Sequence, residues 1–481
     1  MNPQFSRSVV WSVFVLTSYG WAEQPNSCAG LMKFKAPSVE IAKAAPIAAG
    51  TTEPNPYGPG HSAPLPAYCR VEDVINRRTG VGGEEFGINF ALAMPDKWNG
   101  DFLMQGGGGS NGVVLPPLGL NAAGENPALM RGFAVVSTDT GHESHRPFDF
   151  GFMKDQQAHL DFAYLANAEV AALAKQIIAT YYGKPAAFSY FSGCSTGGRE
   201  GMILSQRYPT IFNGIISGDP AMRTGLSNLA IGKWIPIAFN QIAPKDADGK
   251  PIIVQAITDN DRKLITDGLL KQCDAKDGVA DGLISDPLAC DFDPAVLTCK
   301  EGKNESCLAP EKVAAIKKAV GGPKTSVGVQ VYPGFLYDTG ITASGPIRGI
   351  LSPGPGIFGP ATTAMEVDVE KEAPLDVQPL VDSLSTNLAT YSGRGGKLIF
   401  YHGDSDPWFS PLDTFGYYKD MVAANGSIDS PLLIKGLSAN CCKSRETEAW
   451  SYASFSLRLL FAYMDNRVPF VADMHHIGSK Y

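Results

Sequence analysis

The residues with the clearest chemical potential lie in the stretch Gly193-Cys194-Ser195-Thr196-Gly197. It matches the G-x-S-x-G pattern, which places a serine on a sharp turn between a strand and a helix. The turn leaves no room for side chains beside the nucleophile, so glycine stands on both sides. The backbone N–H of the next residue, Thr196, then points towards the developing oxyanion. The pattern predicts an acyl-transfer nucleophile at Ser195.

A second glycine-rich run, Gly106–Gly109, follows an apolar segment that begins at Phe102. Loops of this kind present a further N–H to the oxyanion in esterases, and we assign that role to Gly109. A phosphate-cradling loop is the alternative for such a run. That alternative needs a following Lys-Ser or Lys-Thr pair, which the sequence lacks here.

Two carboxylates stand later in the chain, in His402-Gly403-Asp404-Ser405-Asp406-Pro407. A carboxylate after a late strand orients the histidine base of a serine hydrolase and stabilises its imidazolium. We assign this role to Asp406; a solvated turn is the alternative for an Asp-Pro pair. Phe409 follows, where its ring is placed to stack on an aromatic acyl group, although ordinary packing is equally compatible with the sequence.

The elements that must position these residues alternate between strand and helix. Val170, Leu173, Ile177 and Tyr181 follow the helical repeat, and Gly183 is expected to end that helix. Apolar runs of strand length lie before and after it, and a second helix is expected through Met202 and Leu204. The expected strands are 86–95, 102–106, 132–137, 187–191, 212–217 and 397–402. This order predicts an α/β fold with a mainly parallel sheet covered on both faces.

The strand-and-helix pattern loosens between about Ala221 and Leu384, where cysteines cluster and 344–360 is rich in Gly and Pro. We interpret this stretch as a lid domain inserted into an α/β domain. The expected organisation is therefore a signal peptide over 1–22, the α/β domain over 23–220 and 385–481, and the lid over 221–384.

The composition and charge of the chain limit the class of protein and the partners that it can have. The 481 residues are 44% hydrophobic and 18% charged, enough apolar material for a large core. The 48 acidic residues outnumber the 40 basic ones without a basic stripe, which argues against nucleic acid. Val9–Leu16 followed by Gly20-Trp21-Ala22 is typical of a secretory signal, and no other segment is apolar enough for a membrane span. We expect a secreted or periplasmic protein, in which disulfides are permitted.

The stretch Gly193–Gly201, with a cysteine directly before the serine, resembles the nucleophile motif of the tannase and feruloyl esterase family. The run Gly106–Gly109, the stretch 212–221 and the stretch 402–409 are similar to it as well. The resemblance covers about Cys28 to Asp413. It implies an α/β-hydrolase domain with a lid, and small esters of aromatic acids as substrates, of the feruloyl, galloyl or hydroxyethyl-terephthalate type.

The resemblance also implies a structural Ca²⁺ in the lid, held by Asp274, Asp277, Val279, Asp281 and Leu283. Three carboxylates and two backbone carbonyls are the hard oxygen ligands that Ca²⁺ prefers. It further implies the disulfides Cys28–Cys69, Cys273–Cys290 and Cys299–Cys307, together with a disulfide from Cys194 to Cys442 or Cys441. Nine cysteines are present, so one thiol is left over.

The family places its catalytic histidine just before the cysteine that pairs with Cys194, but this chain reads Ala439-Asn440-Cys441-Cys442 there. A thiol at Cys441 is a poor two-way proton shuttle near neutral pH. From about Leu432 the family pattern ends, which a shifted reading frame or a divergent terminus would explain. We predict a serine carboxylic-ester hydrolase; the alternatives are an impaired or inactive homologue that binds aromatic esters, and a calcium-stapled scaffold without such a ligand.

Overall fold

The computed structural model of the protein describes residues 27–37, 39–55, 60–120, 126–146, 148–300, 305–345, 347–354, 360–425 and 457–462. The expected signal peptide and both Cys441 and Cys442 lie outside these residues. The described strands are β1 (Lys35–Ala36), β2 (Val39–Glu40), β3 (Lys43–Ile47), β4 (Tyr68–Thr79), β5 (Glu85–Pro95), β6 (Phe102–Gln105), β7 (Ala134–Thr138), β8 (Ser189–Cys194), β9 (Gly214–Gly218), β10 (Lys397–Gly403) and β11 (Leu457–Ala462). The described α-helices are α1 (Gln156–Leu160), α2 (Ala166–Tyr182), α3 (Thr196–Arg207), α4 (Thr224–Leu229), α5 (Ile235–Asn240), α6 (Asp259–Cys273), α7 (Pro310–Val320), α8 (Val369–Asp376), α9 (Ala389–Gly393) and α10 (Pro411–Asn425).

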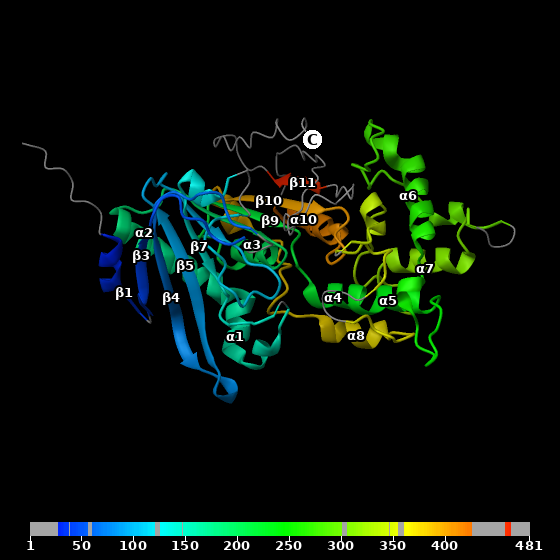
Figure 1. The fold of residues 1–481 in the computed structure, drawn as a ribbon, viewed down its shortest axis with the longest axis horizontal. Coiled ribbons are helices and arrows are strands. Elements are labelled where there is room, and N and C mark those ends of the chain that lie inside the picture. Colours follow the sequence, from blue (N-terminus) through cyan, green and yellow to red (C-terminus); the bar gives the residue numbers. More distant parts are fainter. Residues whose placement is uncertain are drawn as a thin grey trace, which may run out of the picture.

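One mixed sheet organises the larger part of the molecule, with strand order β11-β10-β9-β8-β6-β7-β5-β4-β3 (Figure 1). Its five central strands, from β10 to β7, run parallel, and the strands at both ends are antiparallel. Every residue of β6 and β7 is buried, as expected for central strands packed on both faces. Helices α2, α3 and α10 pack on the sheet. The parallel strands therefore end at one edge, where the predicted catalytic residues follow them.

The apolar runs and the helical repeat predict this sheet well at its centre. The six predicted strands are present as β5 to β10, and α2 ends at Gly183 in a left-handed conformation with φ 70°. The order of the strands within the sheet differs from their order along the chain. β5 and β6, which follow one another across a polar turn, are not neighbours, because β7 lies between them.

The segment between β9 and β10 is built differently. Helices α4 to α8 gather beside the sheet, at the right of Figure 1. They enclose a second hydrophobic cluster whose buried members all fall between Leu226 and Leu351. A separate core of this kind agrees with the predicted insertion. The role of the inserted segment as a lid and its bounds at 221 and 384 stay predictions.

Three disulfides are described, Cys28–Cys69, Cys273–Cys290 and Cys299–Cys307, in the expected pairs. Each closes a short loop, of 41, 17 and 8 residues in sequence separation. None of the helices in the described part of the chain is both long and apolar enough to span a membrane.

Candidate active site

Ser195 occupies a strained turn between β8 and α3. Its backbone has φ 61° and ψ −120°, a region that costs a non-glycine residue about 1–3 kcal/mol. Its N–H donates to the carbonyl of Gly218, at 2.9 Å. A Cβ on Gly193 would lie 2.6 Å from the carbonyl of Gly197, and one on Gly197 would lie 2.7 Å from the carbonyl oxygen of Gly107. The two flanking glycines are therefore required by the close approach of backbone to backbone.

The two predicted oxyanion residues are in direct contact. The hydroxyl of Thr196 donates to the carbonyl oxygen of Gly109, which has φ 58°. Within the described part of the chain, the backbone N–H groups of Gly109 and Thr196 donate to no acceptor. Thr196 is also the first residue of α3, where the helix dipole adds partial positive charge. The pair has the donors and the electrostatics of an oxyanion hole.

Asp406 lies on the loop between β10 and α10, beyond the sheet edge where Ser195 follows β8. Its Oδ1 accepts the N–H groups of Trp408 and Phe409, at 2.8 and 3.1 Å. Its Oδ2 lies 3.4 Å from Nε2 of His402. Phe409 is only 9% exposed, so its predicted stacking on an acyl group stays a prediction.

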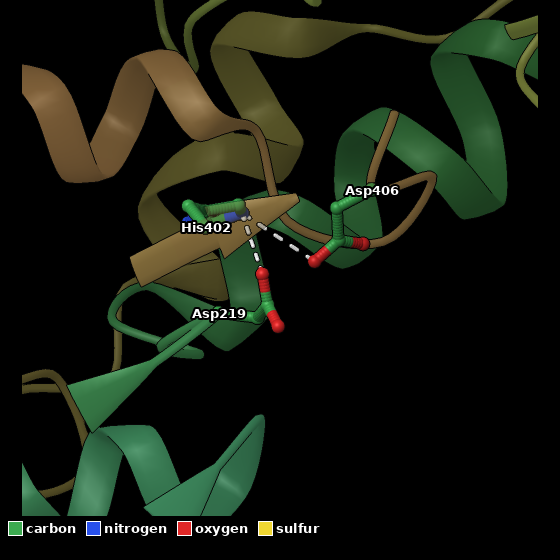
Figure 2. Close-up of side chains that lie close together, drawn as sticks. All are labelled: Asp219, His402 and Asp406. Atoms are coloured by element: carbon green, nitrogen blue, oxygen red, sulfur yellow. Dashed lines mark ion pairs between the residues drawn. The ribbon is translucent and has the colours of Figure 1, made fainter. Parts of the chain in front are cut away.

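His402, at the end of β10, is the described histidine nearest to this carboxylate, and its ring is buried (Figure 2). Nδ1 lies 2.8 Å from Oγ1 of Thr414, and Nε2 lies 3.0 Å from the carbonyl oxygen of Phe409. Burial alone would lower the pKa of His402. The carboxylates of Asp406 and Asp219 outweigh burial and raise the pKa to about 9. His402 is therefore protonated near neutral pH and is poorly suited to accept a proton from Ser195.

Asp219 connects the nucleophile side of the site to the acid side. Its Oδ1 accepts the N–H of Gly403, at 2.6 Å, and lies 4.0 Å from Nε2 of His402. Its Oδ2 lies 3.3 Å from Sγ of Cys194. Burial raises its pKa. Asp219 was not predicted as a site residue, although a carboxylate directly after strand 212–217, in Gly218-Asp219-Pro220, was a usable signal.

Cys194 is disulfide-bonded. The expected partners Cys441 and Cys442 lie outside the described residues. Among the described residues, only Asp219, His402 and Asp406 form a group of three acidic, cysteine or histidine side chains whose ligand atoms all lie within 4.8 Å. Because this His402 is charge-paired, the group is better explained as an ionic cluster than as a metal centre.

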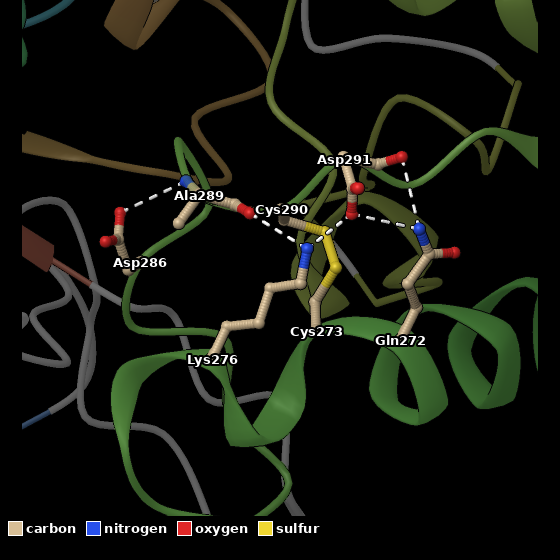
Figure 3. The surroundings of a disulfide bond; sticks show 7 residues. All are labelled: Gln272, Cys273, Lys276, Asp286, Ala289, Cys290 and Asp291. Atoms are coloured by element: carbon tan, nitrogen blue, oxygen red, sulfur yellow. Dashed lines mark hydrogen bonds and ion pairs between the residues drawn. A yellow bond between two sulfur atoms is a disulfide. The ribbon is translucent and has the colours of Figure 1, made fainter.

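The predicted calcium residues lie on an exposed loop that the Cys273–Cys290 disulfide ties back to the chain (Figure 3). Oδ1 of Asp274 accepts the N–H groups of Asp281 and Gly282, at 3.2 and 3.0 Å. The two oxygens of Asp277 accept the N–H groups of Val279 and Ser285, at 3.0 and 2.9 Å. The loop thus winds around its own carboxylates, as oxygen-rich cation loops do.

The chemistry of this donor set fits a hard cation, with carboxylates from Asp274, Asp277 and Asp281 and carbonyls from Val279 and Leu283. Lys276, the cation within the loop, is paired with Asp291 beside the disulfide (Figure 3). The three carboxylates do not approach within 4.8 Å of one another in the way that the Asp219 group does. A bound cation would have to draw the loop tighter.

An ester hydrolase of the α/β type is the class of protein that this sheet and this serine turn define. Residues 69–355 and 358–451 match the family described as tannase and feruloyl esterase. The chain belongs to this family, whose members are carboxylic ester hydrolases. The match continues to residue 451, past Leu432, near which we expected the family pattern to end.

Named relatives agree with this membership. Over 430 residues the chain is 36% identical to the mono(2-hydroxyethyl) terephthalate hydrolase of Piscinibacter sakaiensis, covering 76% of this chain and 71% of that protein. It is 28% identical over 364 residues to a probable feruloyl esterase B-2 of Aspergillus flavus, covering 72% and 65%. Both relatives are named as hydrolases of aromatic esters.

Solved structures share the fold. Feruloyl esterase B from Aspergillus oryzae superposes with a TM-score of 0.65 at 22% identity, over 82% of this chain and 78% of that one. Tannin acyl hydrolase from Aspergillus niger gives a TM-score of 0.59 at 18% identity, over 83% and 78%. At these identities the likeness supports the fold alone.

Proposed function

We propose that the protein is an exported serine hydrolase of small esters of aromatic carboxylic acids, of the feruloyl, galloyl or hydroxyethyl-terephthalate type. The observation that carries the proposal is the contact between Thr196 and Gly109, which brings two uncommitted N–H groups beside the strained turn of Ser195. The names of the relatives support the aromatic acid as the acyl group.

In the proposed reaction, Oγ of Ser195 attacks the ester carbonyl carbon and its proton passes to a base. The N–H groups of Gly109 and Thr196 hold the oxyanion of the tetrahedral intermediate, and the alcohol leaves with a proton. Water then hydrolyses the acyl-enzyme by the same two steps. Asp406 is held in one orientation by the two backbone N–H groups that its Oδ1 accepts, which leaves Oδ2 to orient a base in the proposed reaction.

One observation favours a second candidate, an impaired or inactive homologue that binds aromatic esters. In the described residues the imidazole beside Asp406 is that of His402, and both of its ring nitrogens lie within hydrogen-bonding distance of other groups. The histidine that the family carries before its late cysteine is replaced by asparagine and cysteine. Without a base, most of the rate advantage of a serine nucleophile is lost.

Hydrolysis of methyl ferulate, a gallate ester and mono(2-hydroxyethyl) terephthalate by the purified protein separates these candidates. Turnover that Ser195→Ala abolishes supports the esterase. Absent turnover with retained binding of the same esters, measured by calorimetry, supports the impaired homologue. Binding of none of the three contradicts both candidates.

We also propose that the Asp274–Leu283 loop binds a structural Ca²⁺ and that the mature chain begins after residue 22. The oxygen-only donor set and the adjoining disulfide support the calcium site. The three disulfides and the expected signal peptide support export to an oxidising compartment.

A further inference from the structure

Glu200, on the first turns of α3, is a buried carboxylate that contacts the glycine-rich loop. Glu200 is only 2% exposed. One oxygen accepts the backbone N–H of Gly107, at 3.2 Å, and the other accepts the side-chain amide of Asn111, at 2.5 Å. These two contacts lie on either side of Gly109 in the chain.

The loop needs such contacts because four consecutive glycines have more conformational freedom to lose than any other sequence. Its ends are fixed by backbone bonds, from Gly106 to Ser192 and from Gly112 to Asp139, each at 2.9 Å. Between these ends Asn111 has φ 53°, an uncommon conformation for a residue with a side chain. The hydrogen bond from the side-chain amide of Asn111 to Glu200 offsets that strain.

The ionised form of Glu200 is favoured by the two N–H donors whose hydrogen bonds it accepts and by a neighbouring cation in the same helix. Burial raises the pKa of Glu200, and the neighbouring guanidinium of Arg199 opposes this. Arg199 is itself buried and donates to the carbonyl oxygens of Ala163 and Phe162, at 2.9 and 3.0 Å. A buried, ionised carboxylate accepts shorter and stronger hydrogen bonds than a neutral amide does. A glutamine at this position would turn an NH₂ group towards one of the two donors.

We propose that Glu200 is a positioning residue for the oxyanion hole: through Gly107 and Asn111 it fixes the N–H of Gly109 beside that of Thr196. Its catalytic consequence rests on the esterase function proposed above, whereas its effect on the loop does not. Glu200 lies within the Gly193–Gly201 motif, but its type and position there predict no role.

The test compares Glu200→Gln with the matched control Glu53→Gln. Glu53 accepts hydrogen bonds from Tyr68 and Arg70, at 2.9 and 2.7 Å, beside β4. Hydrogen exchange of the amides of 107–111 is expected to become about tenfold faster in Glu200→Gln and to stay unchanged in Glu53→Gln. Unchanged exchange in Glu200→Gln overturns the proposal.

The second readout is the affinity of an aryl boronic acid, whose boron accepts the serine oxygen and becomes a tetrahedral anion in the oxyanion hole. We expect roughly ten- to hundredfold weaker binding in Glu200→Gln, and a similar fall in kcat with KM little changed. Faster loop exchange with unchanged boronate affinity overturns the positioning role. If the wild-type protein binds no boronate while hydrogen exchange of the loop still becomes faster in Glu200→Gln, the proposed esterase function is contradicted. The effect of Glu200 on the loop is then still supported.

If Glu200→Gln shows no cooperative thermal unfolding and therefore does not fold, Asn111→Ala replaces it in the test. This variant removes one of the two contacts of Glu200 with the loop. It removes the amide contact and leaves the bond between Gly107 and Glu200. The same two readouts are expected to shift in the same direction by a smaller factor, and the absence of any shift contradicts the proposal.

Discussion

The nucleophile side and the acid side of the site are built in contrasting ways. Around Ser195 the contacts are between backbones: glycines of the serine turn lie against the Gly106–Gly109 loop, and two N–H groups are left uncommitted. Around Asp406 the contacts are between charges, because His402 and Asp219 form a buried ionic cluster with it. The first arrangement needs no further residue to hold an oxyanion. The second needs a base, and the imidazole present there is already protonated.

The contrast teaches that the two halves of a serine esterase site can be retained independently. Stabilising an oxyanion depends on the chain path of α3 and one loop, which the fold maintains for reasons of packing. Moving a proton depends on one imidazole in one position. If this chain lacks that imidazole, it still presents the strained turn of Ser195 and the N–H groups of Gly109 and Thr196.

Restoring the base tests this contrast with the largest effect. We expect Cys441→His to raise kcat for methyl ferulate by about 10²–10⁴, because general-base catalysis supplies a factor of this size. The measurement is steady-state hydrolysis by wild type and variant at pH 7.5. Combining the change with Ser195→Ala is the control, and it is expected to remove the gain. An unchanged kcat in Cys441→His would show that the missing base is not the limiting defect.

Removing the charge of His402 tests the ionic side. We expect His402→Asn to lower the free energy of unfolding by about 3 kcal/mol, since two buried carboxylates lose their cation. The exposed His61 offers the control His61→Asn, which should change stability by less than about 0.5 kcal/mol. Equal urea midpoints for the two variants would contradict the ionic cluster.

Asp338 provides a test of pH dependence next to the acid loop. Its buried carboxyl accepts the hydroxyl of Ser405, at 2.5 Å, and burial raises its pKa to about 6. A raised carboxyl pKa favours the folded state at low pH, and this advantage is lost as pH rises from about 4 to about 6. Relative to Asp338→Asn, the wild type should lose about 2 kcal/mol of unfolding free energy over this range and stay level above it. A constant difference between the two proteins across pH 4–8 would contradict the assignment.

Calcium removal tests a loop outside the two sides of the site and should have the smallest effect. If the Asp274–Leu283 loop binds Ca²⁺, adding 1 mM Ca²⁺ to chelator-treated protein is expected to raise Tm by a few degrees. The variant Asp277→Asn should lose most of this shift, and Asp246→Asn, on an exposed loop elsewhere, should keep it. Identical shifts in both variants, or none in the wild type, would count against the site.

The centre of the fold was predictable because apolar strands and one amphipathic helix carry strong periodic signals. The outer strands were not predicted: β4 reads Tyr68–Thr79 with charged residues at many positions, since an antiparallel strand near a sheet end is solvated on one side. The serine turn followed from Gly193 and Gly197, whose missing side chains the structure explains directly. The contacts of Asp219 and Glu200 were not predictable, because their partners Gly403 and Gly107 are distant in sequence and only the strand order brings them together.

The most direct test of the central claim is covalent labelling of Ser195 by an aryl phosphonate ester, followed by mass spectrometry of the intact protein and its peptides. The account predicts one adduct per chain, located on Ser195, absent in Ser195→Ala and formed faster in Cys441→His. An unlabelled wild-type protein, or an adduct at another residue, would contradict the assignment of Ser195 as the nucleophile.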